Sequence, residues 1–589
     1  MSRLVVVSNR VTVPKSRQKP QAGGLAVALT GALAEYGGIW FGWNGQVVRD
    51  PPAEPELTEV DGITYATTPL SRPEYDEYYA GFSNEVLWPV CHFMLGRMEF
   101  RPEYRDTYLA TNERFAAQLA PLIRGDELVW VHDYHLIPFA RALRRHGIQR
   151  PIGFFLHIPF PSYGLLRAMP GWREWLRALA EYDLVGLQTP EDRRALETSL
   201  VYGLGARFVQ GGVELEGRLV RTTAQPVGVE VDSLARMAAS SAGSRRVRRL
   251  IDSLGSRDLI IGAERLDYSK GLPNRFDAYE SLLAHHRERH GRTVFMQIAS
   301  PSRENIAEYE QLREALESKA GHINGVYADF DWVPTRYMNK TFARASLLGF
   351  FRIARVGLVT PLRDGMNLVA KEFVAAQDPE DPGALVLSEL AGAATELESA
   401  LIVNPFDTEG MGDALERALS MPLAERRERW QHMIEVLRDN DLTAWRTRYV
   451  ADLQAAADDR RAHPRAPEPT VVRDASEAFH LAPEDALRRL PGPAGERFVE
   501  LWRHNGASVE LYAPRGRDLQ TPHERGEFYV GARGAATLRC DGSELPCQPG
   551  DLLFVPAGVE HRFVEHSDDF AVWVVFVPGE TDAPTGNRE

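Results

Sequence analysis

Two acidic side chains and a run of backbone amides come together in Val359–Glu372, which has the sequence VTPLRDGMNLVAKE. An apolar strand, Val356–Val359, ends in a short turn that carries Asp364, and the pattern predicts a helix beginning at Gly365. Unpaired N–H groups at a helix start, together with the helix dipole, attract an anion. Asp364 and Glu372 can accept hydrogen bonds from hydroxyl groups. A phosphate at one end and acidic groups beside it predict a nucleotide-sugar site.

Two cations follow another predicted strand, Leu259–Ala263. The block ERLDYSKG (264–271) places Arg265 and Lys270 just past the end of that strand. Paired cations there can neutralise a departing diphosphate, a role that a metal fills in other transferases. The alternative is a surface ion pair between Arg265 and Asp267. We favour the diphosphate role because of the surrounding block.

Short apolar strands alternate with helical patterns in two successive parts of the chain. The first part extends to about residue 225, and the second runs from about 227 to 436. Continuous apolar strands between amphipathic helices predict parallel sheets covered on both faces. Two doubly wound halves place a ligand in the cleft between them, near the carboxyl ends of the strands. The expected strands are Leu4–Ser8, Leu128–His132, Ile152–His157 and Leu184–Gln188, then Leu259–Ala263, Val294–Ser300, Val326–Phe330, Val356–Val359 and Leu385–Ser388, with a helix at Arg105–Leu122.

From Met1 to about Leu453, the sequence resembles the retaining glycosyltransferases of the trehalose-6-phosphate synthase family. So many long blocks in the family's order make chance resemblance implausible. Besides the two blocks above, the matching ones are LVVVSNR (4–10), AGGL (22–25), WFGW (40–43), FSN (82–84), LWP (87–89), VHDYH (131–135) and GFFLHIPFP (153–161).

The resemblance implies an α/β fold of two Rossmann-like doubly wound domains (GT-B type), followed by a small all-β cupin jelly roll. The expected boundaries are 1–225 for an acceptor-binding domain and 226–436 for a nucleotide-sugar-binding domain. Helices at 437–454 would pack back on the first domain. Residues 455–474, rich in Ala, Asp, Arg and Pro, would form a linker, and 475–589 the cupin-like barrel.

On the donor side, the resemblance assigns several residues to nucleotide-sugar binding. Gly23 and Gly24 would let the backbone approach the donor closely, and His157 would hydrogen-bond its glucose. A satisfied buried histidine is the commoner outcome for a lone His157, but the surrounding block favours the binding role. The remaining donor contacts would be Asp364 to glucose hydroxyls, the backbone of Gly365, Met366, Asn367 and Leu368 behind it, Glu372 to the ribose, and Phe351 with Arg352 beside the base or diphosphate.

The acceptor side requires groups that hold a sugar phosphate. Arg10, at the end of the first strand, and Arg303 from the opposite domain would grip the phosphate. Tyr79 and Trp88 would form the wall of the sugar pocket, although without the family blocks both would be interpreted as core aromatics. Asp133 would bind an acceptor hydroxyl.

The family retains the configuration at the donor carbon, and no well-placed carboxylate pair for double displacement is evident in the sequence. The resemblance therefore implies a front-face reaction in which the leaving phosphate oxygen accepts the acceptor's proton. Arg265, Lys270 and the helix start would stabilise the diphosphate, with His157 and Asp364 on the donor glucose. Asp133 as a general base is the competing hypothesis.

The last part of the chain has an all-β pattern of short strands and Gly/Pro turns. PHERGE (522–527) with Gly534, and GDLLFVPAGVEH (550–561), are similar to the paired cupin motifs, with Thr521 in place of the usual first histidine. His523, Glu527 and His561 would suit Zn²⁺, Mn²⁺, Fe²⁺ or Ni²⁺. The alternative is an empty barrel used for oligomerisation or sensing. The expected strands are 508–512, 526–530, 535–539, 552–555 and 570–577.

Bulk properties exclude several classes of protein. The 589 residues carry a net charge of −14, so a general nucleic-acid or anionic-membrane binder is not expected. No signal peptide or membrane-spanning run is evident. The cysteines, Cys91, Cys540 and Cys547, are too few for a disulfide framework, which predicts a cytoplasmic protein. Glycosyl transfer itself is expected to need no cofactor, and the family and cupins suggest a homo-oligomer.

The leading hypothesis is glucose transfer from UDP- or GDP-glucose to glucose 6-phosphate, with the base of the donor left open. One alternative is a sister activity on the same scaffold, either glucosylglycerol-phosphate synthesis or a pseudo-glycosyl coupling. Others are a retired transferase whose cupin tail senses a sugar phosphate, and a tail that is a separate isomerase or dioxygenase. Arg265, Lys270 and Asp364 are all present, which favours an active transferase.

Overall fold

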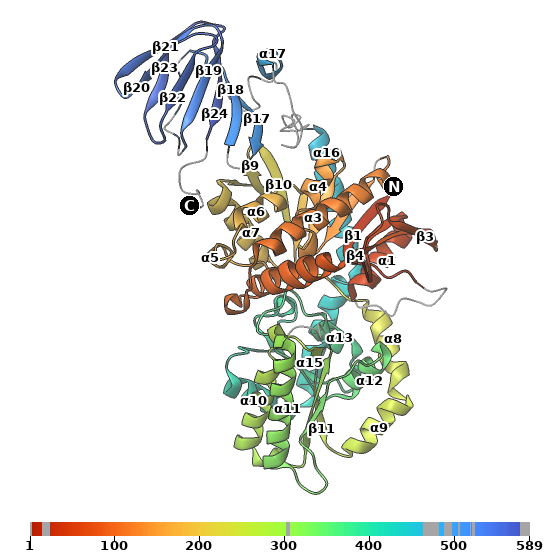
Figure 1. The fold of residues 1–589 in the computed structure, drawn as a ribbon. Coiled ribbons are helices and arrows are strands. Elements are labelled where there is room, and N and C mark those ends of the chain that lie inside the picture. The colour runs from red at the N-terminus through yellow and green to blue at the C-terminus, as the bar shows by residue number, and fades with distance from the viewer. Residues whose placement is uncertain are drawn as a thin grey trace. The chain divides into compact units, whose positions relative to one another are not determined.

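The computed structural model describes residues 3–14, 24–125, 127–301, 307–462, 482–487, 490, 497–504, 507–516, 518, 520, 523 and 525–577. The chain separates into two compact units, Met1–Asp459 and Arg460–Glu589. The first unit contains two parallel sheets with helices on both faces, and the second is mostly antiparallel β-structure (Figure 1). The predicted fold class is confirmed.

The first sheet has the strand order β3-β4-β2-β1-β5-β6-β7-β10-β9-β8. Its central strands pair in parallel, and antiparallel strands close both edges. Parallel pairing brings the carboxyl ends of β1, β5 and β6 to the same edge of the sheet. The residues predicted for the site lie at these strand ends or directly after them. The strands are β1 Leu4–Arg10, β2 Gly38–Val48, β3 Glu56–Val60, β4 Ile63–Ser71, β5 Leu128–His132, β6 Ile152–Phe155, β7 Leu184–Leu187, β8 Arg207–Val209, β9 Gly212–Leu215 and β10 Arg218–Ala224.

Helices cover both faces of this sheet. One face packs against η1, α3, α4, α6 and α7, and the other against α1 and α16. The helices are α1 Gly24–Tyr36, the π-helix η1 Glu74–Leu87, α2 Trp88–Cys91, α3 Pro102–Leu119, α4 Phe139–Arg145, α5 Tyr163–Leu166, α6 Trp172–Leu179, α7 Pro190–Leu204 and α16 Leu442–Ala462, with 3-10 turns η2 Leu95–Arg97, η3 Ala120–Leu122 and η4 Tyr134–Leu136.

The second sheet has the order β13-β12-β11-β14-β15-β16, and its strands are parallel throughout. Helices α8, α9 and α12 pack together, as do α10, α11 and α14, and Figure 1 shows the two groups on opposite sides of β11. The strands are β11 Asp258–Arg265, β12 Thr293–Ser300, β13 Thr335–Met338, β14 Val356–Val359, β15 Ala384–Ser388 and β16 Leu401–Val403. The helices are α8 Val231–Ala242, α9 Arg245–Leu254, α10 Leu272–His285, α11 Ala307–Tyr327, α12 Arg344–Ile353, α13 Leu368–Ala376, α14 Thr408–Ser420 and α15 Leu423–Asp439, with 3-10 turns η5 Tyr268–Lys270, η6 Arg287–Arg289 and η7 Gly392–Thr395.

Two sequence predictions were wrong in this unit. The strand expected at Val326–Phe330 does not form, because α11 continues to Tyr327 and the edge strand is β13 instead. Val326 and Phe330 are 57% and 107% exposed, so their apolar character did not indicate a sheet position. The start of the expected linker is also helical, since α16 continues to Ala462 and buries Ala456 and Ala457.

Helix α16 returns the chain to the first sheet. Tyr449 lies stacked on Trp130 of β5, with ring centroids 4.6 Å apart, and its hydroxyl donates to the carbonyl of Phe154 at 2.9 Å. Trp445 packs on the same Trp130 ring at 5.1 Å. These aromatic contacts attach the chain that follows the second sheet to the first sheet.

The second unit contains two antiparallel sheets, β17-β18-β24-β19-β22 and β21-β20-β23. Its inner cluster includes Tyr529, Val555, Phe563 and Phe570. The all-β prediction for this part is therefore confirmed. The elements are α17 Pro483–Leu487, β17 Phe498–His504, β18 Ala507–Tyr512, β19 Glu527–Arg533, β20 Ala536–Cys540, β21 Ser543–Cys547, β22 Leu552–Val555, β23 His561–His566 and β24 Ala571–Phe576.

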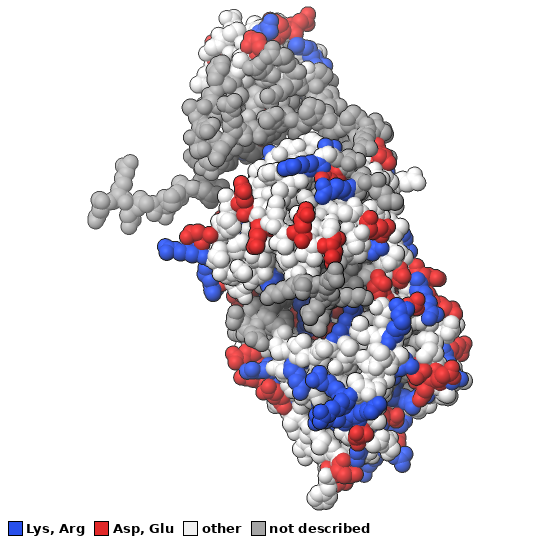
Figure 2. Space-filling model, turned by 90° about the vertical axis from the view of Figure 1, so that its right-hand side faces the viewer, with Lys and Arg blue, Asp and Glu red and all other residues white. Residues whose placement is uncertain are grey.

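The surface carries both signs of charge. On the face shown in Figure 2, Lys and Arg side chains lie interspersed with Asp and Glu side chains. Such a mixed surface differs from the basic face that nucleic-acid binding requires. Within the described ranges, no helix has the length and apolar character needed to cross a lipid bilayer.

Candidate active site

Helix α13 begins at Leu368, three residues later than predicted. Asn367 adopts a left-handed conformation (φ 72°), and its side chain accepts a hydrogen bond from the N–H of Ala370 at 3.4 Å. Asn367 is therefore the N-cap of α13. The loop before it is held by η7, the turn that follows β15, because the Ala393 N–H donates to the Met366 carbonyl at 2.8 Å. The helix still directs its amino end toward the turn that carries Asp364, so the predicted anion-binding geometry is retained.

A network of charged groups lies in front of this helix. The Nζ atom of Lys270 is 2.5 Å from Oδ2 of Asp364, and the Asn367 amide donates to the same oxygen at 3.0 Å. Asn367 also donates to Oε1 of Glu264 at 3.0 Å, and buried Arg275 donates to that oxygen at 3.2 Å. Five side chains from β11, η5, α10 and the loop before α13 thus fix one another.

Glu264 and Arg275 were not among the residues predicted for the site. Arg275 is fully buried, and it also donates to the carbonyl of Lys270 and to the hydroxyl of Thr360, both at 3.2 Å. It therefore supports the loop of Lys270 from behind. Glu264 lies inside the ERLDYSKG block, so its position beside Arg265 was a usable signal, whereas nothing in the helical pattern around Arg275 distinguished it.

In the first half of this unit, Asp133 and His157 follow β5 and β6. Asp133 has φ 75°, and its Oδ1 accepts a hydrogen bond from the backbone N–H of His157 at 3.3 Å. Nε2 of His157 lies 3.1 Å from Nδ1 of His132. Burial lowers the pKa of His157 to about 3 and that of His132 well below its usual value. Both rings are therefore neutral near pH 7, and a neutral imidazole can donate or accept a hydrogen bond.

Gly365 brings the two halves of this unit into contact. A Cβ atom there would lie 2.4 Å from the carbonyl oxygen of His157 and 3.0 Å from Cα of Ile158. Arg363 makes a second connection, with its guanidinium 3.1 Å from Glu191 of α7. The structure therefore gathers Asp133, His157, Asp364 and Lys270 at one place between the sheets.

Arg265 lies beside Trp88, with its guanidinium carbon 5.6 Å from the ring centroid. Within the described residues, Arg265 forms no ion pair, so its N–H groups are available to a ligand. Trp88 is 4% exposed and packs on His92 with ring centroids 4.1 Å apart. The sequence analysis missed His92. Burial, and then the charge of Lys270, lower its pKa to about 4.

The predicted acceptor residues Arg10 and Tyr79 both lie against Trp43. The Arg10 guanidinium carbon is 4.8 Å from a Trp43 ring centroid, and the Tyr79 ring is 5.3 Å from that of Trp43. Tyr79 also stacks on His135 at 5.9 Å. Arg10 is exposed and forms no ion pair with any described residue. This group therefore presents an open guanidinium beside aromatic walls.

Three of the predicted donor residues are not part of the group formed by Asp133, His157, Asp364 and Lys270. Phe351 is buried against Phe373, and Arg352 pairs with Asp378 at 2.9 Å and donates to the Gln377 carbonyl at 3.0 Å. These contacts hold Arg352 at the carboxyl end of α13, opposite Asp364. Glu372 pairs with Arg344 of α12 at 2.5 Å, a partner that the sequence did not indicate.

Among the remaining predicted residues, Gly24 is the first residue of α1. Gly23, Arg303 and Thr521 lie outside the described residues.

The second unit contains a compact group of metal-ligating types, His523, Glu527 and His561, whose ligand atoms lie within 4.8 Å of one another. Nδ1 of His561 is 2.8 Å from the Val559 carbonyl, which can only accept, so Nδ1 carries a proton and Nε2 is the ring atom left for a metal, 3.4 Å from Glu527 Oε1. His523 lies 2.6 Å from Glu527. The group therefore fits a divalent transition metal.

Tyr529 completes this group, and the sequence analysis missed it. Its hydroxyl is 2.8 Å from Glu527 Oε2 and 2.8 Å from His561 Nε2. It also lies 3.0 Å from Gln520 Oε1, and a single phenolic proton can serve only one of these three partners. Cys540 and Cys547 are free thiols, and Cys547 packs in the core.

Comparison with known proteins gives one family for each unit. The model of glycosyltransferase family 20 matches residues 2–455, and that of the cupin domain matches residues 508–577. A trehalose-6-phosphate synthase from Sodalis glossinidius is 46% identical over 456 residues, which are 77% of this chain and 96% of the relative.

The solved structures that are similar to this chain are also trehalose-phosphate synthases. A crystal structure of an α,α-trehalose 6-phosphate synthase from Burkholderia multivorans is 50% identical, with a TM-score of 0.76 over 79% of this chain and 99% of the other. A UDP-forming α,α-trehalose-phosphate synthase from Burkholderia xenovorans, in complex with glucose-6-phosphate, is 47% identical, with a TM-score of 0.73 over 77% and 100% of the two chains.

Proposed function

The chain belongs to glycosyltransferase family 20, and we propose that it transfers glucose, with retention, from UDP-glucose to glucose 6-phosphate to form trehalose 6-phosphate. The observation that supports this most directly is the Lys270–Asp364–Asn367 group at the start of α13, which faces Asp133 and His157. Uridine as the base rests on the similarity to the Burkholderia xenovorans relative, which is a UDP-forming synthase.

In the proposed reaction, the bond between glucose C1 and the diphosphate oxygen breaks, and a bond forms between C1 and the acceptor's anomeric oxygen. The acceptor's proton passes to the departing diphosphate oxygen on the same face. Arg265, without an ion-pair partner in the described chain, and Lys270, with two donors left beyond Asp364, would bind that diphosphate. The helix dipole of α13 adds to this charge.

Neutral His157 and the carboxylate of Asp364 are proposed to hold the hydroxyls of the donor glucose. The low pKa of His157 keeps it uncharged beside that sugar. Arg10 would grip the acceptor phosphate, with Tyr79 and Trp88 as walls and Asp133 on a hydroxyl. Gly23, Gly24, Arg303, Phe351, Arg352 and Glu372 remain predictions.

An NMR assay of the purified full-length protein tests the function. UDP-glucose or GDP-glucose is supplied with glucose 6-phosphate or glycerol 3-phosphate. We expect an α,α-1,1-linked disaccharide phosphate from UDP-glucose and glucose 6-phosphate only. Product from glycerol 3-phosphate would favour the glucosylglycerol-phosphate alternative, and no product from a folded protein would favour a sensor or a pseudo-glycosyltransferase.

For the second unit, we propose that His523, Glu527 and His561 hold a divalent transition metal. The orientation of His561, whose Nδ1 donates to the Val559 carbonyl and whose Nε2 lies beside Glu527, supports this, and such an ion would supply Lewis-acid character to the barrel. Elemental analysis of the full-length protein should show about one metal per chain, lost in His561→Ala. Substoichiometric metal after growth in supplemented medium would contradict the proposal.

Domains at 1–225 and 226–436, return helices beginning at 437 and a cupin-like tail from 475 remain our proposal, as does a homo-oligomeric state, whereas the linker begins later than 455 because α16 continues to Ala462. The division into compact units after Asp459 supports the separation of the transferase from the tail.

A further inference from the structure

A fully buried lysine joins helix α13 to the chain that connects the two halves of the transferase unit. Lys371 lies in the first turn of α13, and its side chain has no exposed area. Its Nζ is 2.5 Å from Oε2 of Glu396 and donates to the carbonyl of Val227 at 2.8 Å. A buried charge is costly unless it is paired and hydrogen-bonded. Both partners are therefore needed to keep Lys371 charged at this position.

The first partner, Val227, lies in the segment 225–230, which leads from β10 of the first sheet to α8 of the second half. Its N–H donates to Oε1 of Gln188 at 3.1 Å, and Gln188 is buried directly after β7. Two residues earlier, the N–H of Gln225 donates to the carbonyl of Leu187 at 2.9 Å. The connecting segment is thus hydrogen-bonded to the end of β7 on one side and to α13 on the other.

The chain returns to the first half at the same place. Asn440 and Asp441 connect α15 to α16. A Cβ atom on Gly228 would lie 2.2 Å from the carbonyl oxygen of Asn440 and 2.3 Å from the carbonyl carbon of Asp441, so the two connections are in direct contact. A shift of either connection would therefore change how the two halves face each other.

The second partner, Glu396, follows η7, the turn that holds the loop of Asp364. The N–H of Asp364 donates to the carbonyl of Leu390, and the N–H of Gly392 donates back to the carbonyl of Asp364, both at 3.1 Å. Lys371 thus joins the segment that fixes Asp364 to the segment that connects the halves.

We propose that Lys371 is a positioning residue for the glucose transfer proposed above. Because none of its side chain is exposed, it contacts no substrate and acts through Val227 and Glu396. It fixes the donor loop before α13 relative to the half that carries Asp133. A displacement of about 1 Å between reacting groups can cost about 100-fold in rate. An apolar side chain would fill the same space at lower cost, but it could not donate to the Val227 carbonyl.

Steady-state kinetics of the full-length protein test this role. Lys371→Met combined with Glu396→Gln removes both charges, so neither is left buried without a partner. We expect kcat to fall by about 10- to 100-fold, while the KM values for UDP-glucose and glucose 6-phosphate stay within about twofold because each half keeps its own substrate contacts.

Gln188→Leu tests the same link from the first half. It removes the acceptor of the Val227 N–H, and we expect the same fall in kcat with unchanged KM values. Because both sets of substitutions act through Val227, combining them should lower kcat no further than the larger separate effect. Should the Lys371→Met, Glu396→Gln protein fail to fold, Gln188→Leu provides the test by itself.

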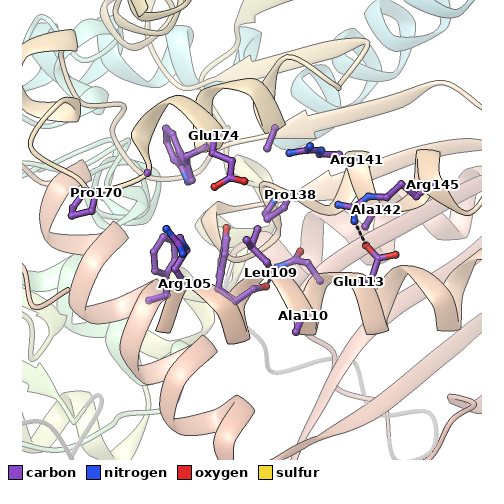
Figure 3. A pocket seen from close by; sticks show the side chains of 16 residues that line it. Arg105, Leu109, Ala110, Glu113, Pro138, Arg141, Ala142, Arg145, Pro170 and Glu174 are labelled. Atoms are coloured by element: carbon purple, nitrogen blue, oxygen red, sulfur yellow. Dashed lines mark hydrogen bonds and ion pairs between the residues drawn. The ribbon is translucent and has the colours of Figure 1, made fainter. Parts of the chain in front are cut away.

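Two variants serve as controls, one in each half. Lys319→Met breaks an ion pair with Asp277 between α11 and α10. Arg141→Gln changes an exposed arginine that lines a cavity between α3, α4 and α6 (Figure 3), and this lining shares no residue with the Lys371 link. Both variants should keep the kcat and KM values of the parent.

Pulsed EPR measures the orientation of the halves without relying on activity. Spin labels are placed at Arg194→Cys of α7 and Asp252→Cys of α9, both exposed, in a Cys540→Ser background with UDP and glucose 6-phosphate present. We expect one narrow distance distribution with Lys371 and Glu396 in place, and a shifted or broader one in the Lys371→Met, Glu396→Gln protein.

A lower Tm with parental kcat in the folded Lys371→Met, Glu396→Gln protein would overturn the proposal, because the pair would then only stabilise the fold. A fall in kcat without any change in the distance distribution would also overturn it. A changed distribution in a protein whose parent shows no transfer would support the link and count against the proposed function, so the two failures are distinguishable.

Discussion

Lys270 and Asp364 are 94 residues apart in sequence, and Nζ of the one lies 2.5 Å from Oδ2 of the other. The contact joins the end of β11 to the loop before α13. Their side chains are only 8% and 13% exposed, so water screens the pair weakly. One cation and one carboxylate are thereby fixed where a diphosphate and a sugar hydroxyl would meet.

The first prediction concerns Lys270. Lys270→Ala removes a fixed charge from the departing diphosphate, and we expect kcat to fall by about 100- to 1,000-fold. The substitution also leaves the Asp364 carboxylate without its cation, so a lower Tm is expected. Lys340→Ala, an exposed lysine of the same half, is the matched control. Unchanged kcat in a folded Lys270→Ala protein would contradict the assignment.

Asp133→Asn distinguishes the two views of proton transfer. If the leaving phosphate accepts the proton, the amide can still hold the acceptor hydroxyl, and kcat should fall by less than about 10-fold. A loss of about 100-fold or more, with little change in the KM for glucose 6-phosphate, would establish a base role for Asp133. Steady-state kinetics with both substrates varied separate these outcomes.

Gly365→Ala should impair the contact between the two halves. The added Cβ would lie 2.4 Å from the His157 carbonyl oxygen, a backbone atom that cannot rotate away. We expect kcat/KM to fall by at least about 10-fold, because the donor loop and His157 would be forced apart. Gly321→Ala, in open space on α11, should leave activity unchanged. Full activity in Gly365→Ala would show that catalysis does not depend on the close contact between Gly365 and the backbone of His157.

Arg10→Ala should weaken acceptor binding. Charge-assisted hydrogen bonds contribute about 1.5–3 kcal/mol, so the KM for glucose 6-phosphate should rise about 10- to 150-fold while that for UDP-glucose stays constant. Arg49→Ala, an exposed arginine just after β2, is the control. An equal rise for both substrates would place Arg10 outside the phosphate site.

The buried histidines make stability depend on pH. Burial lowers the pKa of His157 to about 3 and that of His92 to about 4, whereas the unfolded chain titrates near 6.5. Below pH 6.5 the unfolded state binds more protons, so the free energy of unfolding should fall as pH drops from 7 to 5.5. Each histidine contributes up to about 1.4 kcal/mol per pH unit. Urea titrations of His92→Phe should show a shallower dependence, and those of exposed His432→Gln an unchanged one.

The sequence by itself determined the two α/β halves and the positions of Asp133, His157, Arg265, Lys270 and Asp364 near the carboxyl ends of strands. Apolar runs such as Leu128–His132 and Val356–Val359 formed as expected, because buried parallel strands depend on local composition. The cupin-like pattern likewise identified His523, Glu527 and His561, since turn residues and alternation are local signals.

Only the tertiary structure decided which side chains meet. The support of Lys270 by Arg275, the pairing of Glu372 with Arg344, and the retention of Arg352 at the far end of α13 all depend on how separate helices pack. The later start of α13 depends on Asn367 taking φ 72° to cap it. Such contacts are set by side-chain shape across long sequence separations, which no local pattern encodes.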